Sequence, residues 1–320
     1  MTSVSSLTMS DGAVLERVST AVVPLDWPST VERVVLCIGA QKAATSFFYT
    51  QFARAPDVCV SPPPYKEVHY WDCVENETYN ARRHRRRGRK RLSNVLRAAT
   101  LPALTGDKNA RAALRNAVSV NVIRHRGLSA RARYRDLLLA NYAGEPVVFE
   151  ATPGYATVSQ EVLEQMAQIA PDTRLMLLMR DPVDRLWSAA KYFFRKRIAA
   201  GEATLDDAYD FFQGRYQNRS SIDFAHSDYG TTLRRLDAAG LMDRLHVVFY
   251  ETMHTEREQA AVTEMMGRSC ALDFGTRSNY HGTPAGAEVY DLDVAVPAFA
   301  ETYEAVRARF GDRVPEAWRG

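Results

Sequence analysis

The chain has 320 residues and lacks several features that mark particular protein classes. Its four cysteines, at positions 37, 59, 73 and 270, form no CxxC pair, so we predict neither a disulfide framework nor a zinc site. No apolar run approaches the ~20 residues that cross a bilayer. The N-terminus has no basic start followed by an apolar stretch, so no secretory signal is predicted. We therefore expect a cytoplasmic protein with reduced thiols and no membrane span.

Acidic residues are almost absent from one long stretch. Residues 82–135 hold 17 Lys and Arg against a single acid, Asp107, although the whole chain carries only +3. The densest run, residues 82–91, could bind nucleic acid, acidic lipid headgroups or a polyanionic acceptor, or form a solvated, partly disordered loop. Few aromatics interleave with it and no nucleic-acid module is recognisable, which disfavours nucleic acid. Our hypothesis is a mobile lid whose cations favour an anionic acceptor.

Short apolar runs alternate with helical patterns along the rest of the chain. The expected strands are Arg33–Ile38, Val147–Phe149, Leu175–Met179 and Leu245–Tyr250. They are apolar throughout, as parallel strands covered on both faces are. The expected helices are Glu161–Ala170, Pro182–Lys196 with Asp181 as N-cap, Tyr229–Ala239 and Thr255–Met266. This order predicts an α/β fold, a P-loop-like domain with a central parallel sheet flanked by helices.

Two regions interrupt the alternation. Residues 1–30 have weak periodicity and two prolines, so we expect an irregular N-terminal arm ahead of a single domain at 31–320. Residues 76–142 are an expected insertion into that domain, basic and largely helical. Its short helices are predicted at Leu92–Leu104 and Tyr134–Tyr142.

The first chemical motif follows the first expected strand, at residues 39–46 (GAQKAATS). A tight loop of small residues before a helix aims backbone N–H groups and the positive end of the helix dipole at one point. Lys42 adds a cation, and Thr45 and Ser46 add hydroxyls, so the segment is a candidate phosphate or sulfate cradle. It is not a Walker A loop, because Lys42 comes two residues too early.

The second motif is at residues 180–188 (RDPVDRLWS). Arg180 ends a strand, at the edge where open parallel sheets bind ligands. Ser188 follows about two helical turns later, and a guanidinium with a hydroxyl suits a phosphate monoester. The alternative is a structural ion pair of Arg180 with Asp181 or Asp184.

At this stage three interpretations remain open. The chain could be a sulfotransferase, a P-loop-like kinase of a small metabolite, or a basic nucleic-acid-binding protein. A kinase requires Mg²⁺ and a nucleoside triphosphate, but no convincing Mg²⁺-binding Asp follows a later strand. A nucleic-acid binder would hold its affinity in residues 82–135.

Taken together, the motifs resemble the signatures of the PAPS-dependent sulfotransferase superfamily, where PAPS is 3′-phosphoadenosine-5′-phosphosulfate. The loop at 39–46 is similar to the 5′-phosphosulfate loop, and Arg180 with Ser188 is similar to the 3′-phosphate motif. Residues 66–72 (KEVHYWD) and 150–155 (EATPGY) resemble segments of the heparan-sulfate-type enzymes and their bacterial relatives. The resemblance covers about residues 33–75 and 145–255. It implies a single α/β domain, PAPS as donor and no metal.

The resemblance also implies roles for individual residues. Catalysis falls to Lys42, which stabilises the leaving phosphate, and to Glu67 as general base with His69 beside it, so that either or both could take the acceptor proton. The donor-binding residues are Gln41, Lys42, Ala43, Ala44, Thr45, Ser46, Arg180 and Ser188. The acceptor-side residues are Lys66, Trp71 and Tyr155.

Two positions depart from the family pattern. The loop usually has glycine where Ala44 stands, and alanine there is expected to require a negative φ. Heparan-type enzymes tend to have lysine where Ala151 stands, so a glycosaminoglycan acceptor is disfavoured. Aromatic residues near the expected cleft suit a sugar ring or a lipid- or polyketide-like alcohol equally well. A loop at residues 277–282 is expected to close over the adenine.

Overall fold

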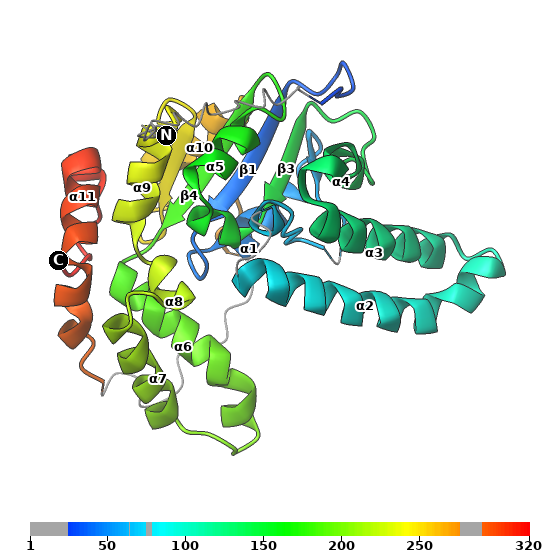
Figure 1. The fold of residues 1–320 in the computed structure, drawn as a ribbon. Coiled ribbons are helices and arrows are strands. Elements are labelled where there is room, and N and C mark those ends of the chain that lie inside the picture. Colours follow the sequence, from blue (N-terminus) through cyan, green and yellow to red (C-terminus); the bar gives the residue numbers. More distant parts are fainter. Residues whose placement is uncertain (1–24, 64, 75–78, 276–289) are drawn as a thin grey trace, which may run out of the picture.

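The fold is built around one parallel sheet (Figure 1). The computed structural model describes residues 25–63, 65–74, 79–275 and 290–320. Within them, five strands lie side by side in the order β2-β3-β1-β4-β5, all parallel. Their bounds are β1 Arg33–Gly39, β2 Val58–Val60, β3 Val147–Ala151, β4 Thr173–Met179 and β5 Leu245–Phe249. The predicted α/β fold class is confirmed.

The four predicted strands are all present, and their burial explains why the sequence pattern predicted them. Every residue of β3 is buried, and so is every residue of β1 except Arg33, so these strands are apolar on both faces. The structure adds β2, whose three residues are too few to show a period. The sheet therefore has an edge strand that the sequence pattern did not predict.

Helices cover both faces of the sheet. The chain moves from β1 toward β2 through α1 (Thr45–Phe52), but from β3 toward β4 through α5 (Gln160–Ala167). Because crossovers are right-handed and these two run in opposite directions, α1 and α5 lie on opposite faces. The helix α9 (Tyr229–Ala238) packs beside α5, and α10 (Glu256–Met266) packs on β5 and β1.

The helix ends follow the sequence signals. Asp181 caps α6 (Pro182–Ala199), where its carboxylate accepts from the N–H groups of Val183 and Asp184 at 3.0 Å each. Thr255 caps α10, which ends at Gly267 with φ of 67°. The prediction of these caps is confirmed.

The helices α7 Leu205–Gln217 and α8 Ile222–Ala225 pack on α6, and α11 Ala300–Phe310 packs on α9. Short 3₁₀ turns lie at η1 Trp71–Cys73, η2 Gly127–Ala130, η3 Pro153–Thr157, η5 Asp293–Phe299 and η6 Gly311–Arg313. The C-terminal tail returns to the sheet edge, where Arg319 pairs with Asp181 at 3.1 Å and Asp184 at 2.8 Å.

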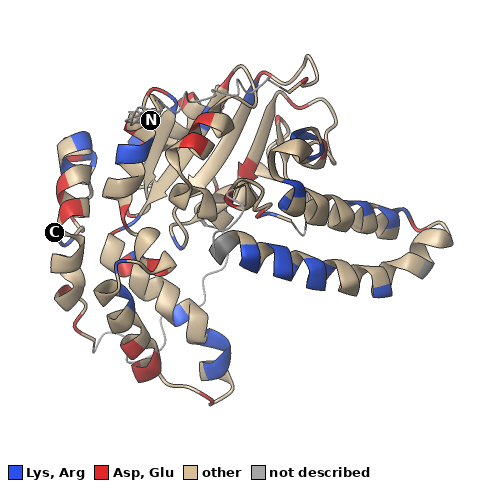
Figure 2. Cartoon of the chain, viewed as in Figure 1, with Lys and Arg blue, Asp and Glu red and all other residues tan. Residues whose placement is uncertain are grey.

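The basic stretch forms a helical hairpin that projects from the body (Figures 1 and 2). Its helices are α2 Tyr79–Leu104 and α3 Lys108–Arg126, followed by α4 Arg131–Leu138. The expected basic, largely helical insertion is present, and the alternative of a solvated loop at residues 82–91 does not hold, because all ten residues lie in α2. Arginine is a good helix former, and the run buries His84 and Gly88 on the face toward α3. The predicted short helix Leu92–Leu104 is the second half of α2.

Three further sequence predictions can be located only in part. Most of the expected N-terminal arm lies outside the described residues, and residues 25–32 have no helix or strand. The expected adenine loop at 277–282 also lies outside them. None of the described helices is long and apolar enough to cross a membrane.

Candidate functional site

The two motifs meet because their strands are neighbours. β1 and β4 pair directly, with Leu36 opposite Leu175, and both run in the same direction. Their carboxyl ends therefore adjoin, and this is where the loop with Lys42 and the residue Arg180 begin. Open parallel sheets bind ligands at such an edge.

The loop after β1 has an unusual backbone. Lys42 and Ala44 have φ of 71° and 72°, a left-handed conformation that costs a non-glycine residue about 1–2 kcal/mol. The expectation that Ala44 requires a negative φ is therefore wrong. α1 begins at the next residue, Thr45, so the first N–H groups of the helix face the loop. Ala43 is buried and Gln41 is exposed.

Lys42 lies within a cluster of cations. Its ammonium stands 4.1 Å from the ring centre of Tyr192 on α6, and the guanidinium of Arg195 stacks on the same ring at 3.5 Å. Burial, followed by the charges of Arg180, Arg195, Arg185 and Lys191, lowers the pKa of Lys42 to about 8. Cations that repel each other so strongly form a site suited to an anion.

Arg180 belongs to the same cluster of cations, and one of its hydrogen-bond donors has no acceptor among the described residues. Its guanidinium lies 4.7 Å from the ring centre of Tyr250, and its Nε is buried with no hydrogen-bond partner among the described residues. The alternative of an ion pair with Asp181 or Asp184 is not seen, since both carboxylates pair with Arg319. A buried guanidinium N–H without a partner calls for an acceptor such as a phosphate oxygen.

One face of α6 extends this cluster. Ser188 is half-buried on α6, and Lys191 and Arg195 follow it at spacings of three and seven residues. That spacing puts the three side chains on one side of the helix. Lys191 and Arg195 were not assigned to the site from the sequence, although the helical period from Ser188 could have revealed them.

Lys66 contacts the end of the loop that follows β1. Its ammonium donates to the hydroxyls of Thr45 at 3.2 Å and Ser46 at 2.8 Å, and lies 3.7 Å from Glu67. Burial lowers its pKa, and the Glu67 charge opposes that shift. Lys66 was predicted on the acceptor side, and this geometry favours a second cation at the donor loop instead.

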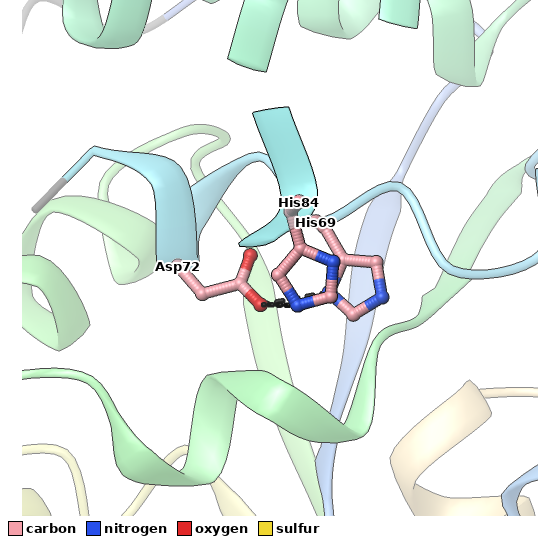
Figure 3. A group of neighbouring side chains, drawn as sticks. All are labelled: His69, Asp72 and His84. Carbon is pink, nitrogen blue, oxygen red and sulfur yellow. Dashed lines mark hydrogen bonds and ion pairs between the residues drawn. The ribbon is translucent and has the colours of Figure 1, made fainter. Parts of the chain in front are cut away.

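Glu67, His69 and Asp72 form a hydrogen-bonded row. The Nδ1 of His69 lies 2.7 Å from Oδ2 of Asp72 (Figure 3). The Nε2 of His69 lies 3.3 Å from Oε2 of Glu67. Asp72 is 3% exposed, whereas the Glu67 side chain is 41% exposed. The row thus runs from a buried carboxylate to one that reaches solvent.

The charges of the row stabilise one another. Burial alone would lower the pKa of His69, but Asp72 and the hydrogen bond to Glu67 outweigh it and raise that pKa. Burial would likewise raise the pKa of Glu67, yet the His69 hydrogen bond and the charges of His69 and Lys66 lower it to about 2. Glu67 is therefore ionised at neutral pH, and its carboxylate and that of Asp72 favour the protonated form of His69.

The hairpin contributes to this row, which the sequence did not indicate. His84 of α2 stacks on His69, with ring centres 3.5 Å apart and planes at 19°. Arg124 of α3 donates to the carbonyls of Val68 at 2.8 Å and Glu67 at 3.2 Å. His84 lies within a run of arginines that has no helical period of apolar residues, so the sequence did not identify it as a buried residue.

Trp71 and Tyr155 were predicted to contact the acceptor, but both are fully buried. The Trp71 ring packs edge-on against Tyr70 and Tyr134. The Tyr155 hydroxyl donates to Glu150 at 3.0 Å and accepts from the N–H of Tyr70 at 3.1 Å. These contacts make both rings supports for the Glu67 segment, and neither offers a surface to an acceptor.

His69, Asp72 and His84 are also the only group of three potential metal ligands among the described residues, with their ligand atoms within 4.8 Å of one another. The geometry is poor for a metal. Two nearly parallel stacked imidazoles direct their lone pairs side by side, whereas a Zn²⁺ ion needs them to converge at ~2.0–2.1 Å. The group is better described as two histidines beside a shared carboxylate.

Solved structures with a similar fold include sulfotransferases. The sulfotransferase from Alicyclobacillus acidocaldarius matches with a TM-score of 0.51 and 19% identity, over 86% of this chain and 94% of that one. The sulfotransferase domain of the Synechococcus PCC 7002 olefin synthase gives 0.46 and 14%, over 89% and 94%. The sulfotransferase domain from the curacin biosynthetic pathway gives 0.44 and 13%, over 87% and 96%.

Sequence comparison adds nothing to this match, since no protein-family model and no curated protein matches the chain. An identity of 19% establishes the shared fold and no more. On that basis, the chain has the α/β fold of the sulfotransferase from Alicyclobacillus acidocaldarius.

Proposed function

We propose that the chain is a PAPS-dependent sulfotransferase of the heparan-sulfate-type branch. One observation carries the proposal: the cations Lys42 and Arg180 extend from the adjoining ends of β1 and β4. A nucleotide with phosphate at both ends of its ribose would bridge them. The shared fold with the sulfotransferase from Alicyclobacillus acidocaldarius supports this assignment.

The donor site divides into two ends. The 5′ end would lie on the loop, with Lys42, the first N–H groups of α1, and the hydroxyls of Thr45 and Ser46 that Lys66 already contacts. The 3′-phosphate would lie against Arg180 and Ser188, with Lys191 and Arg195 nearby. The unpartnered Nε of Arg180 fits this group. When bound, PAPS supplies the sulfuryl group that the acceptor oxygen receives.

Glu67 is the residue we assign as the base. His69 lies between two carboxylates that raise its pKa and favour its protonated form, whereas Glu67 is ionised and partly exposed. A carboxylate with a pKa of about 2 is a weak base. We therefore expect Glu67 to take the proton only as the acceptor oxygen bonds to sulfur, when the hydroxyl has become strongly acidic.

The acceptor is a hydroxyl compound, either a saccharide or a natural-product or lipid-like alcohol. Ala151 is fully buried at the end of β3, where heparan-type enzymes carry lysine, so this position offers no cation to a glycosaminoglycan. The exposed cations on α2, such as Arg86, Arg89 and Lys90, favour an anionic acceptor. Because these residues are helical, their cations lie on the surface of a helix rather than on an irregular loop.

The two alternative functions fit less well. A P-loop kinase needs a carboxylate at a strand end to hold Mg²⁺. Asp181 follows β4 but is committed to capping α6 and to Tyr303 and Arg319. A nucleic-acid binder would hold its affinity in residues 82–135, yet Arg124 of this stretch is buried and donates to the carbonyl of Val68 in the Glu67 segment.

Calorimetry with adenosine 3′,5′-bisphosphate tests the donor site. We expect binding in the presence of EDTA, and Arg180→Ala should weaken it by about 100-fold or more, the scale of a charged hydrogen-bond partner. Arg309→Ala, at an exposed arginine of α11, removes the same charge away from the site and should bind like wild type. Binding that requires Mg²⁺, or no binding at all, would reject the proposal.

Turnover separates Glu67 from the donor site. With PAPS and a panel of sugars, phenols and aliphatic alcohols, Glu67→Gln should lose about 100-fold or more in kcat, the usual contribution of a general base. Its affinity for adenosine 3′,5′-bisphosphate should stay near wild type. Lys42→Ala should lower kcat by roughly 10²–10³. Full turnover by Glu67→Gln would move the base role elsewhere.

A further inference from the structure

The hairpin reaches the row of Glu67, His69 and Asp72 through a single ring. His84 lies on the second turn of α2 and is 7% exposed. Its imidazole covers the ring of His69 at 3.5 Å, and its Nε2 lies 3.7 Å from the Asp72 oxygen that His69 also contacts. Figure 3 shows the two rings overlapping beside that carboxylate. His69 is thus held between Asp72 at its edge and His84 on its face.

Two arginines of the hairpin fix the backbone on either side of His69. Arg85, next to His84, donates to the carbonyl of Cys73 at 3.0 Å and to that of Arg124 at 2.7 Å. Arg124 in turn donates to the carbonyls of Glu67 and Val68. The hairpin therefore forms hydrogen bonds to both ends of the segment from Glu67 to Cys73, and His84 packs on its middle.

The pair of histidines also has a defined charge arrangement. The charged groups facing it are Glu67 and Asp72 from the segment, and Arg83 and Arg124 from the hairpin. Burial, followed by the charge of His69, lowers the pKa of His84 to about 3, so His84 is neutral. A neutral ring can stack on the charged imidazole of His69 without repelling it.

His69 itself needs such support. It has φ of 54°, a left-handed backbone that a histidine adopts at a cost, so the local chain does not favour this position by itself. The turn η3 packs closely on the other side, since a Cβ on Gly154 would lie 2.6 Å from Asp72. The row is therefore held by packing from both sides.

We propose that His84 is a positioning residue that acts by stacking: it holds His69 between Glu67 and Asp72 and keeps water out of that row. This rests on the proposed sulfuryl transfer, because it makes the basic hairpin part of the catalytic site. Without the stacked ring, His69 would rotate and its contacts with both carboxylates would be hydrated. Glu67 would then lose the partner that orients it toward the acceptor.

Three variants test the proposal, with turnover followed as formation of adenosine 3′,5′-bisphosphate from PAPS and an acceptor. His84→Ala should lower kcat by about 10-fold to 100-fold, the effect of misplacing a catalytic group, and leave affinity for adenosine 3′,5′-bisphosphate unchanged. His84→Phe keeps a stacked ring and should retain most of the activity. His125→Ala, an exposed histidine on the same hairpin, should match wild type.

Histidine NMR gives a readout that does not depend on activity. In wild type, His69 should titrate above its ordinary pKa, and in His84→Ala that pKa should fall toward about 6.5 as water screens Asp72 and Glu67. In His84→Phe it should stay raised. Unchanged kcat and unchanged His69 titration in His84→Ala would overturn the proposal, as would equal losses in the Ala and Phe variants.

The same measurements separate the two proposals. If the wild-type chain neither binds adenosine 3′,5′-bisphosphate nor turns over PAPS, the proposed function fails, and the NMR titration still decides whether His84 positions His69. If wild type is active and His84→Ala is indistinguishable from it in both readouts, only the role of His84 fails. Should His84→Ala not fold, the comparison of His84→Phe with wild type decides.

Discussion

Lys42 and Ala44 adopt left-handed backbone conformations within three residues of each other. Such a conformation turns the chain sharply between β1 and α1 and brings backbone N–H groups toward one point. Neither residue is glycine, so the turn is maintained by the packing around it. Buried Ala43 and Thr45 hold the positions on either side.

Replacing Ala44 with glycine should stabilise the protein. Glycine has no penalty at φ of 72°, and it is a better helix N-cap than alanine, which is the position of Ala44 in α1. The larger freedom of glycine in the unfolded chain offsets part of this gain. We expect a net increase of about 0.5–1 kcal/mol in the free energy of unfolding, measured by urea denaturation.

The matched control lies at the other end of the same helix. Ala53, the C-cap of α1, has φ of −64°, where glycine brings only a cost. Ala53→Gly should therefore destabilise by about 0.5–1 kcal/mol. If Ala44→Gly also destabilises, the left-handed conformation of this loop is incorrect.

At the scale of elements, α2 shows what the sequence predicted and what it did not. Leu92–Leu104 was predicted because it carries an apolar period, whereas residues 82–91 have so few apolar residues that no period was visible. In the structure, the inward face of that half is made by Ala81, His84 and Gly88. Small and aromatic residues can form the buried face of a helix. Such a face is recognised only once the partner helix, here α3, is known.

Gly88 offers a test of the hairpin. It is buried in the interior of α2, and a Cβ there would meet Asn121 and Arg124 at 3.5 Å or more, which is ordinary contact. Gly88→Ala should therefore fit and stabilise the protein by about 0.5–1 kcal/mol through helix propensity. Thermal unfolding would show it as a rise in Tm.

Gly214 in α7 provides the comparison. Nothing lies within 4 Å of a Cβ added there, so Gly214→Ala reports helix propensity alone. Similar gains in both variants would support close but unstrained packing of α2 on α3. A loss of stability in Gly88→Ala alone would mean that the two helices lie closer together than these distances allow, or that residues 82–91 are not helical.

At the scale of the whole molecule, the sequence predicted the proximity of Lys42 and Arg180 better than the surroundings of Trp71 and Tyr155. Lys42 and Arg180 could be paired because each follows an apolar run, and adjacent parallel strands bring such ends together. Trp71 and Tyr155 were placed near the acceptor for their chemistry, but tertiary packing buries them. The contribution of His84 depends on how a distant hairpin docks, which no local pattern encodes.

Docking of these layers also buries two histidines whose burial outweighs the nearby Asp72 charge, which makes the fold acid-sensitive. Burial, then the His69 charge, lowers the pKa of His84 to about 3, and burial, then the Arg185 charge, lowers that of His226 to about 3. Below about pH 6.5 the unfolded chain protonates these histidines and the folded chain does not. The free energy of unfolding should therefore fall as the pH falls, by about 1.4 kcal/mol per pH unit for each histidine.

The contributions of several other titratable groups fall outside this pH range and can be separated from those of His84 and His226. The raised pKa of His69 adds stability that is complete below about pH 6.5, so it does not change the slope there. Glu67 and Asp72 have lowered pKa values, and their contribution is lost only below about pH 4.5. Between these limits the lowered pKa of His246 adds to the slope, and the raised pKa values of Glu150 and Glu251 oppose it, so the share of each histidine is isolated by its own variant.

Urea unfolding across that window measures the slope directly. His226→Gln should reduce the slope by about 1.4 kcal/mol per pH unit, the contribution of one histidine, because glutamine does not titrate. His254→Gln, at an exposed histidine, should leave the slope unchanged. A wild-type stability that is flat across the window would show that His84 and His226 reach water, and the docking of α2 and of α8 onto the body would then be looser than their burial implies.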